Sequence, residues 1–215
     1  MIPIQNIYYM LSYAFQVLNE QGYKNIATEQ FNNTGELMAA ILEKGIAIQL
    51  KRGLGKEYIL QTEALSSLRG KIDIAESIKT QSMLRKQLIC TYDEFSVNSI
   101  MNRIIKSTVE LLLRSNISKQ RKKNLRKLMV YFSEVDFIDL YTVNWNVQYN
   151  RNNQTYHMLI SICYLVVKGL LQTQSNGHTE LMDFLDEQRM CRLYEKFILE
   201  YYRKGVCYTH LTLPT

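Results

Sequence analysis

The sequence predicts an α+β protein that is predominantly helical, with a small N-terminal helix and strand region followed by a helical bundle. Apolar residues recur at three- and four-residue spacing through most of the chain, as they do on the buried face of a helix. Two segments, 57–65 and 87–95, are instead rich in the Tyr, Ile, Leu and Thr residues that favour strands. The 215 residues are 47% hydrophobic and include two prolines, which excludes a disordered chain.

The chain is expected to begin with a buried helix over residues 3–21. Pro3 suits its first turn, because the missing N–H is not needed there and the fixed φ is already helical. The apolar series continues at helical spacing until Gly22 closes it. A second helix is predicted over residues 34–50, with Thr34 as its N-cap.

The two predicted strands are separated by a turn at Arg69-Gly70-Lys71 and a short helix near residues 75–83. After the second strand the apolar period becomes helical again. The elements expected there are a helix that follows Ser99, helices at about 118–133, 156–171 and 186–204, an extended segment at 143–149 and a polar loop at 150–153. We therefore divide the chain into an N-terminal α+β region, residues 1–97, and a helical region, residues 98–205.

The chain is moderately basic. It has 26 Lys and Arg against 20 Asp and Glu, which gives a formal net charge of +6 and a pI near 9.0. Much of the surplus lies on one predicted helix, in Lys119, Arg121, Lys122, Lys123, Arg126 and Lys127. These side chains form either the solvated face of that helix, the more usual role of a charge run, or contacts to DNA phosphates.

Cysteine use and missing motifs narrow the class of protein. The four cysteines form no C-x-x-C pair, which favours a reducing, cytoplasmic location over a disulfide framework or a zinc site. No apolar run approaches the roughly 20 residues that span a bilayer. A P-loop motif is absent, and His157 and His178 lack the spacing of metal ligands. We expect no cofactor or metal in this chain.

Five sequence motifs follow one another between residue 1 and about residue 204. The first is Ile2-Pro3-Ile4 with Asn6-Ile7-Tyr8-Tyr9-Met10. The others are Lys51-Arg52-Gly53-Leu54 with Glu57-Tyr58, Leu68-Arg69-Gly70-Lys71-Ile72-Asp73, Asn102-Arg103-Ile104-Ile105-Lys106-Ser107-Thr108, and Leu193-Tyr194-Glu195-Lys196-Phe197 after Asn176-Gly177-His178. Together they resemble the McrC family, the non-GTPase subunit of the McrBC 5-methylcytosine-dependent DNA restriction system.

The resemblance implies a partner protein. McrC-like proteins bind the hexameric ring of McrB, an AAA+ GTPase, insert their N-terminal region into it and stimulate GTP hydrolysis, so GTP would be bound by the partner. The contacts we expect are Arg52, Arg69 and Lys71, each in a basic turn with a glycine, and less strongly Asn102 and Arg103. A hairpin turn and a helix C-cap explain the glycine turns equally well, and helix capping explains Asn102.

The resemblance also implies a nuclease. McrC-like proteins carry a C-terminal PD-(D/E)xK domain, in which an acid and an acid-x-Lys motif hold Mg²⁺. None of the lysines in this chain follows an Asp or Glu by two positions. We therefore interpret the chain as a truncated McrC-like subunit that is not an enzyme by itself, whose full-length gene would add Mg-dependent DNA cleavage.

The last ten residues, 206–215, are expected to be non-native. The run from Tyr208 to Thr215 resembles the translation of a transposon-end sequencing adapter, although Cys207 stands where that translation usually has Ser. A natural tail is the alternative. We accordingly leave this segment out of the fold prediction.

Two other interpretations of the whole chain stay open. A stand-alone basic DNA-binding module, centred on residues 119–127, would act without a GTPase partner and would bind DNA with a steep dependence on salt. A fragment without a stable fold would instead aggregate through the uncovered apolar face of its last helix.

Overall fold

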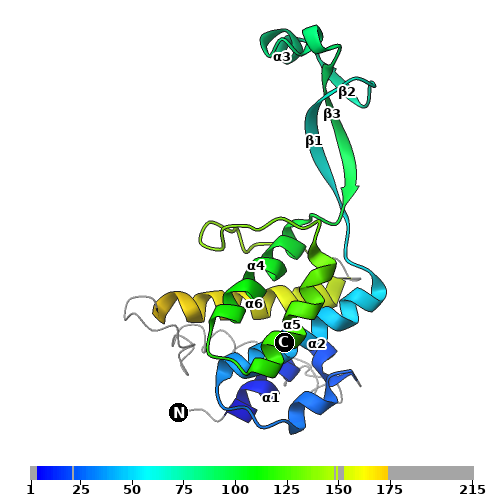
Figure 1. Ribbon diagram of the computed structural model, residues 1–215. Helices are drawn as coiled ribbons and strands as arrows, with labels where there is room; N and C mark the ends of the chain where they lie inside the picture. Colours follow the sequence, from blue (N-terminus) through cyan, green and yellow to red (C-terminus); the bar gives the residue numbers. More distant parts are fainter. Residues whose placement is uncertain (1–3, 21, 148, 150–152, 174–215) are drawn as a thin grey trace, which may run out of the picture.

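The computed structural model describes residues 4–20, 22–147, 149 and 153–173. These residues form a helical body from which a long, thin arm projects (Figure 1). The fold is α+β and dominated by helices, which confirms the predicted class.

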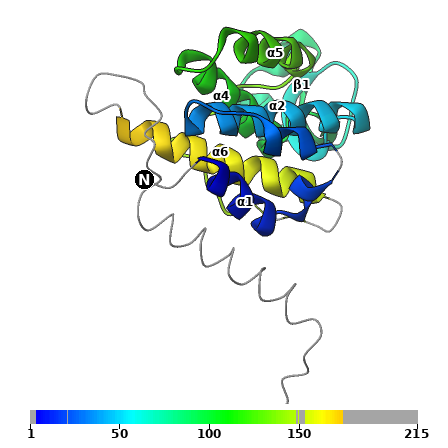
Figure 2. The same ribbon diagram turned by 90° about the horizontal axis from the view of Figure 1, so that it is seen from below.

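The helices of the body share one hydrophobic core. They are α1 (Ile4–Ala14), α2 (Thr34–Arg52), α4 (Ile100–Arg114), α5 (Lys119–Met129) and α6 (Gln154–Thr173), with 3₁₀ turns η1 (Gln16–Asn19), η2 (Lys24–Thr28) and η4 (Val130–Phe132). Helix α6 packs against α2 and α4, and Figure 2 shows it between those helices and α1. Leu11, Ile41, Ile104 and Leu159 meet in this core with no exposed surface. Burial of each such side chain contributes about 1.5–3 kcal/mol.

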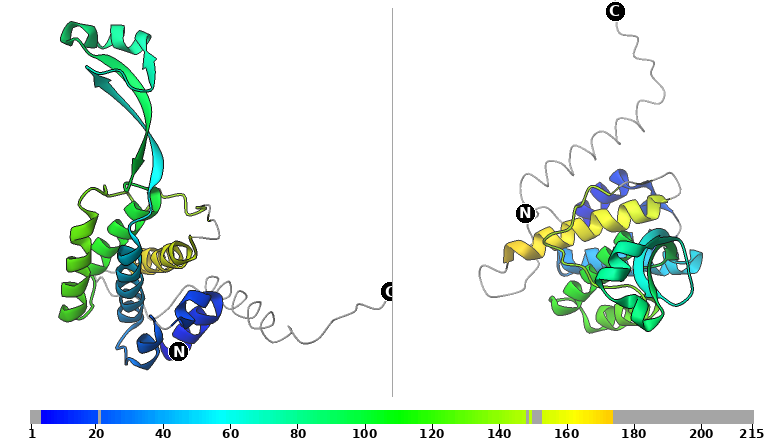
Figure 3. Two further views of the ribbon diagram at one scale, coloured as in Figure 1. Left: turned by 90° about the vertical axis from the view of Figure 1, so that its right-hand side faces the viewer. Right: turned by 90° about the horizontal axis from the view of Figure 1, so that it is seen from above.

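The arm comprises residues 57–96 and leaves the body between α2 and α4 (Figure 3). Its shaft is an antiparallel ribbon of β1 (Glu57–Leu65) and β3 (Leu88–Ser96), in register from Glu57↔Ser96 to Leu65↔Leu88. At the far end, β2 (Lys71–Asp73) pairs with the other edge of β3, and α3 (Ile74–Lys79) and the turn η3 (Ser82–Arg85) form the tip. Nine residues per strand make the shaft about 30 Å long.

Two details of the N-terminal half differ from the prediction. The first helix stops at Ala14, because Phe15 is extended (φ −125°, ψ 102°) and turns its buried side chain into the core before η1 begins. The N-cap of α2 is Asn33 and not Thr34. Asn33 has the extended backbone that a cap needs, and its Oδ1 accepts a hydrogen bond from the N–H of Glu36 at 2.8 Å.

The strands and the later helices follow the prediction closely. Both strands are confirmed to within a residue, the short helix near 75–83 appears as α3 followed by η3, and the basic helix predicted at 118–133 appears as α5 with η4. The described part of segment 143–149 forms no strand. Its side chains alternate nonetheless, because Val143, Trp145, Val147 and Tyr149 pack against the core while Asn144 and Asn146 are exposed.

The helix predicted at 186–204 and the tail at 206–215 lie outside the described residues, as does most of the loop at 150–153. The boundary predicted between residues 97 and 98 falls where the arm returns to the body at α4. Helices from both sides of this position contribute to the same core.

Candidate functional site

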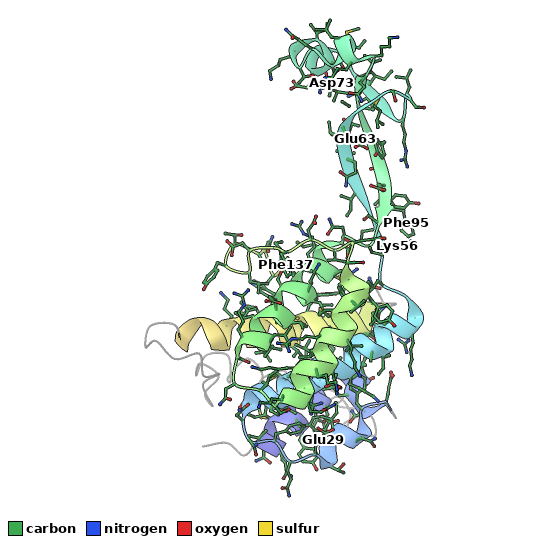
Figure 4. The ribbon with its side chains drawn as sticks, viewed as in Figure 1. Glu29, Lys56, Glu63, Asp73, Phe95 and Phe137 are labelled. Carbon is green, nitrogen blue, oxygen red and sulfur yellow. The ribbon has the colours of Figure 1, made fainter. Side chains whose placement is uncertain are left out.

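The shaft of the arm exposes large apolar side chains along one side. Tyr58, Leu60 and Phe95 are 74%, 66% and 55% exposed, and the strand register places them on the same side of the ribbon. The rings of Tyr58 and Phe95 lie 5.0 Å apart, and the Lys56 ammonium lies 5.7 Å from the Phe95 ring, near the base of the arm (Figure 4). Because a lone ribbon is marginally stable in water, this apolar side is a candidate surface for a partner.

The tip of the arm inverts the usual distribution of polar and apolar side chains. More than half of each large apolar side chain is exposed in Leu68, Ile74, Ile78, Met83 and Leu84. Small polar side chains are buried there instead. Ser77 Oγ donates to the Asp73 carbonyl and accepts from the Ile89 N–H at 2.8 Å, and Ser82 Oγ donates to the Ser77 carbonyl. Hydrogen bonds therefore hold the tip together and leave its apolar surface available for binding.

Charge is segregated along the arm. The strands of the shaft hold no Lys or Arg and four acids, Glu57, Glu63, Asp93 and Glu94. Residues 66–87 hold five basic side chains, Arg69, Lys71, Lys79, Arg85 and Lys86, against Asp73 and Glu76. Both of these acids are engaged locally, since Asp73 caps α3 at the Glu76 N–H and Glu76 pairs with Lys79 at 3.4 Å. This basic segment on an acidic shaft favours a partner that presents anionic groups to residues 66–87.

The turn at Arg69-Gly70-Lys71 has a structural role and also presents an arginine. Gly70 has φ +68°, and a Cβ there would lie 2.3 Å from the Thr91 carbonyl oxygen, so only glycine lets β2 approach β3. The Arg69 guanidinium lies 4.0 Å from the Tyr92 ring centroid, and the Tyr92 hydroxyl donates to Glu63. Stacking on the ring limits the rotamers of Arg69 while its side chain stays exposed.

Comparison with known proteins identifies the family. A family model described as McrBC 5-methylcytosine restriction system component matches residues 5–212. The chain belongs to this family. The match extends into residues 206–215, for which a non-native origin stays a prediction.

The relatives are longer than this chain. Type IV methyl-directed restriction enzyme EcoKMcrBC of Escherichia coli K12 is 28% identical over 214 aligned positions, and the alignment covers 98% of this chain and 62% of that protein. The cryo-EM structure of the Thermococcus gammatolerans McrBC complex matches with a TM-score of 0.61 at 21% identity, over 97% of this chain and 60% of that one. A half-complex from a tetradecameric assembly of McrB AAA+ hexamers with bound McrC, also from Thermococcus gammatolerans, matches with a TM-score of 0.58 at 20% identity. This match covers 93% of this chain and 48% of that one. The two structures show that the fold is shared.

The basic turns of this McrBC-family chain lie at different levels of the arm. Arg52 is the last residue of α2, at the base of the arm, and its Nη1 donates to Thr155 Oγ1 at 3.4 Å. Gly53 follows as the C-cap with φ +91°. Arg69 and Lys71 lie beside Tyr92 and Thr91, about halfway along the shaft. The structure therefore does not bring the three expected contact residues together.

The motif that begins at Asn102 serves the body of the protein. Asn102 is fully buried, and its N–H bonds to Ser99 Oγ at 3.3 Å, so Ser99 and not Asn102 is the N-cap of α4. Arg103 is half-buried and its Nη2 donates to the Phe137 carbonyl at 3.3 Å. Asn102 is thus absent from the surface, and Arg103 is tied to a neighbouring segment.

The basic helix α5 holds two kinds of cation. Arg121 is buried to 17% exposure between three carboxylates, with Nη2 at 2.8 Å from Glu29, Nη1 at 2.9 Å from Glu43 and Nε at 3.6 Å from Glu36. It therefore fastens α5 to α2 and the segment before it. The other cations of this basic run form no ion pair in the described structure: Lys119, Lys122, Lys123, Arg126 and Lys127.

Sequence reasoning missed the apolar tip of the arm. The available signal was the short helix near 75–83, because its Ile78 and the flanking Ile74 and Leu84 have no predicted core to face. In the residues that the structure describes, no helix is long and apolar enough to cross a membrane. Nor do three or more His, Cys, Asp or Glu side chains group there as metal ligands would.

Proposed function

We propose that this chain is the partner-engaging part of an McrC-type subunit in the cytoplasm, and that its arm enters the ring of an McrB-like AAA+ GTPase hexamer. The observation that carries this proposal is the arm itself. A ribbon of two strands is narrow enough for a channel that excludes the helical body, and about 30 Å of shaft separates the tip from the body. A solved relative is described as McrB AAA+ hexamers with bound McrC, which supports the choice of partner.

The arm would stimulate GTP hydrolysis through the turn at residues 69–71. A preoriented guanidinium there stabilises developing negative charge or orders a catalytic group where it meets an active site. Arg69 fits this role because it is exposed and stacked on Tyr92. Lys71, on the adjacent strand β2, adds a second positive charge. Arg52, at the base of the arm, would contact the rim of the ring.

Removal of the arm tests this function. Gly55 and Val97 both accept hydrogen bonds from one Asn102 amide, so their backbones are adjacent and a short Gly-Ser turn can replace residues 57–96. The body cluster contains no residue of this segment, so the core is retained. We expect the excised chain to fold and to lose both co-elution with an McrB-like partner and stimulation of its GTPase. Undiminished stimulation by the excised chain would contradict the proposal.

DNA cleavage would come from sequence that this chain does not provide. The Escherichia coli relative is named as a methyl-directed restriction enzyme, and this chain spans 62% of its length. The residues of this chain do not fit the Mg²⁺ site of a PD-(D/E)xK nuclease, because no lysine follows an acid by two positions. We therefore do not propose DNA cleavage for this chain.

Helix α5 favours a second candidate function, contact with DNA phosphates. Lys119, Lys123 and Lys127 succeed one another at four-residue intervals, and Lys122 and Arg126 form a parallel row. Like charges at this spacing repel by about 0.2–0.5 kcal/mol per pair on a helix surface. Since Arg121 occupies the neighbouring acids of α2, nothing described in the protein relieves this repulsion. Bound phosphates would relieve it.

Salt dependence tests the DNA contact. We expect the chain alone to bind duplex DNA with an affinity that falls steeply as salt rises. Replacement of Lys119, Lys123 and Lys127 by Gln should lower the slope of log K against log salt by roughly 0.9 per lost phosphate contact. Replacement of Lys44, Lys51 and Lys79 removes the same charge elsewhere and is the control. An equal change of slope in both variants would reject α5 as the contact surface.

A further inference from the structure

The two chain segments that connect the arm to the body converge on a single buried side chain. Asn102 Nδ2 donates to the Gly55 carbonyl at 2.9 Å and to the Val97 carbonyl at 2.8 Å. Gly55 lies just before β1 and Val97 just after β3, so one amide group holds both ends of the arm. Asn102 itself is fixed by α4, where it is fully buried.

Tyr156 completes the arrangement from α6. Its hydroxyl donates to Asn102 Oδ1 at 2.7 Å and accepts from the Gly55 N–H at 2.7 Å. The donors and acceptors therefore run in a closed ring through Gly55, Tyr156 and Asn102, in which each bond polarises the next. Every polar atom of the Asn102 side chain is used, and Tyr156 is 3% exposed. We call Gly55, Val97, Asn102 and Tyr156 the arm joint.

The arm has little else to hold its direction. Its strands and tip helices pack on one another, and no comparably extensive contact joins them to a helix of the body. The chain enters the arm through Gly53, Leu54 and Gly55, a segment with two glycines. Such a segment would bend freely if it were not held. A second anchor lies beside it, where Asn98 donates to Asp136 Oδ2 at 2.6 Å and accepts from the Asp136 N–H at 2.8 Å.

We propose that Asn102 and Tyr156 are positioning residues that fix the angle at which the arm leaves the body. The observation behind this is the juxtaposition of α4, α6 and both connecting segments at one ring of buried hydrogen bonds. The ring also explains Gly55, because a Cβ there would lie 3.0 Å from the Tyr156 ring. Burial raises the pKa of Tyr156, which keeps the hydroxyl protonated and able to donate.

The consequence for the partner rests on the proposed function. If the arm enters a ring, a fixed angle determines how the body sits on the outside of that ring. A rigid arm also loses less conformational freedom on binding than a hinged one, so the joint strengthens association by preorganisation.

Distances between the tip and the body test the joint in the isolated chain. Spin labels are placed at Lys79→Cys and Arg114→Cys, whose native side chains are 78% and 73% exposed, with Cys191 and Cys207 replaced by Ser. Cys90 and Cys163 are buried and stay. We expect double electron–electron resonance to give one narrow distribution, and Tyr156→Phe to broaden or shift it.

A matched control separates positioning from stability. Tyr8→Phe also removes a buried hydroxyl, one that donates to the Leu18 and Tyr23 carbonyls far from the arm. It should lower the melting temperature and leave the distribution unchanged. Gly55→Ala adds a methyl group that presses on the Tyr156 ring. It should broaden or shift the distance distribution although no polar group is lost. Distributions in Tyr156→Phe and Gly55→Ala that superimpose on the unsubstituted one would overturn the proposal.

Stimulation of the partner's GTPase provides a separate test. We expect Tyr156→Phe to raise the concentration needed for half-maximal GTPase stimulation by about tenfold, because the loosened arm must be ordered on binding. An unchanged concentration would overturn the link to the partner. The distance measurement involves no partner, so failure of the proposed function would leave its result standing.

Discussion

At the scale of a residue, Arg69 is positioned by the fold of the arm and is the residue that we expect to stimulate the partner's GTPase. The guanidinium stacks on Tyr92 beside a glycine that the turn requires, so the fold sets its position while the side chain stays exposed. We expect Arg69→Ala to lower GTPase stimulation by about tenfold or more, because a preoriented donor is lost. The free energy of unfolding should change by about 1 kcal/mol at most, as for other exposed cation–π contacts.

Steady-state GTP hydrolysis by an McrB-like partner, titrated with each variant, checks this prediction. Arg85→Ala is the matched control, because Arg85 is also exposed on the arm and carries the same charge. Stimulation by Arg69→Ala equal to that of the unsubstituted chain would remove Arg69 from the mechanism.

Two weakly acidic side chains, Cys163, which is fully buried, and Tyr149, which is partly buried, predict how stability depends on pH. Burial raises the pKa of the Cys163 thiol from 9.0 to about 12, and burial also raises the pKa of Tyr149 to about 12. Both groups stay neutral in the folded protein but ionise in the unfolded chain above their ordinary pKa values. Their contribution to stability is therefore complete below about pH 9 and is lost as the pH rises toward 12.

Urea unfolding midpoints, measured from about pH 8 to about pH 11, should fall throughout that window. Cys163→Ala should lower the midpoint at neutral pH, since it opens a small cavity, and should flatten the decline at alkaline pH. A decline of the same steepness in Cys163→Ala would show that the thiol does not cause it.

At the scale of an element, we expect the tip of the arm to be a binding surface, because its helices are too small to cover their apolar residues. Ile78 and Leu84 are 62% and 81% exposed. Since burial of such a side chain contributes about 1.5–3 kcal/mol, we expect the double substitution Ile78→Ser and Leu84→Ser to weaken partner binding by tenfold or more. The stability of the isolated chain should change little, because neither side chain is in the core.

Val130→Ser with Tyr131→Ser is the control for this prediction. These residues are 71% and 67% exposed on the body. Their substitution therefore removes two exposed apolar side chains at a place away from the arm. Co-sedimentation with an McrB-like partner distinguishes the two pairs. Equal weakening by both would place the contact outside the tip.

At the scale of the whole molecule, the sequence predicted what local chemistry determines. Strand composition located β1 and β3, and Gly70 located the turn between them, but the short strand β2 that follows this turn was not predicted. The projection of the arm was not predictable, because composition does not say whether a ribbon packs on the body. The role of Asn102 was hidden for a related reason. Its partners Gly55 and Tyr156 lie 47 and 54 residues away along the chain. Because the sequence does not show such distant contacts, it suggested only a local role for Asn102, that of a helix cap.

The shared core leads to a prediction about the molecule as a whole. Because α1 and α2 pack with α4, α5 and α6, the parts before and after the arm should form one cooperative unit. Trypsin should cut first at the exposed tip, at Lys79, Arg85 or Lys86. The two fragments should then elute together in native gel filtration and separate only in denaturant, as Arg121 and the buried apolar side chains hold them together. Fragments that part under native conditions would instead show that residues 1–97 and 98–205 are independent domains.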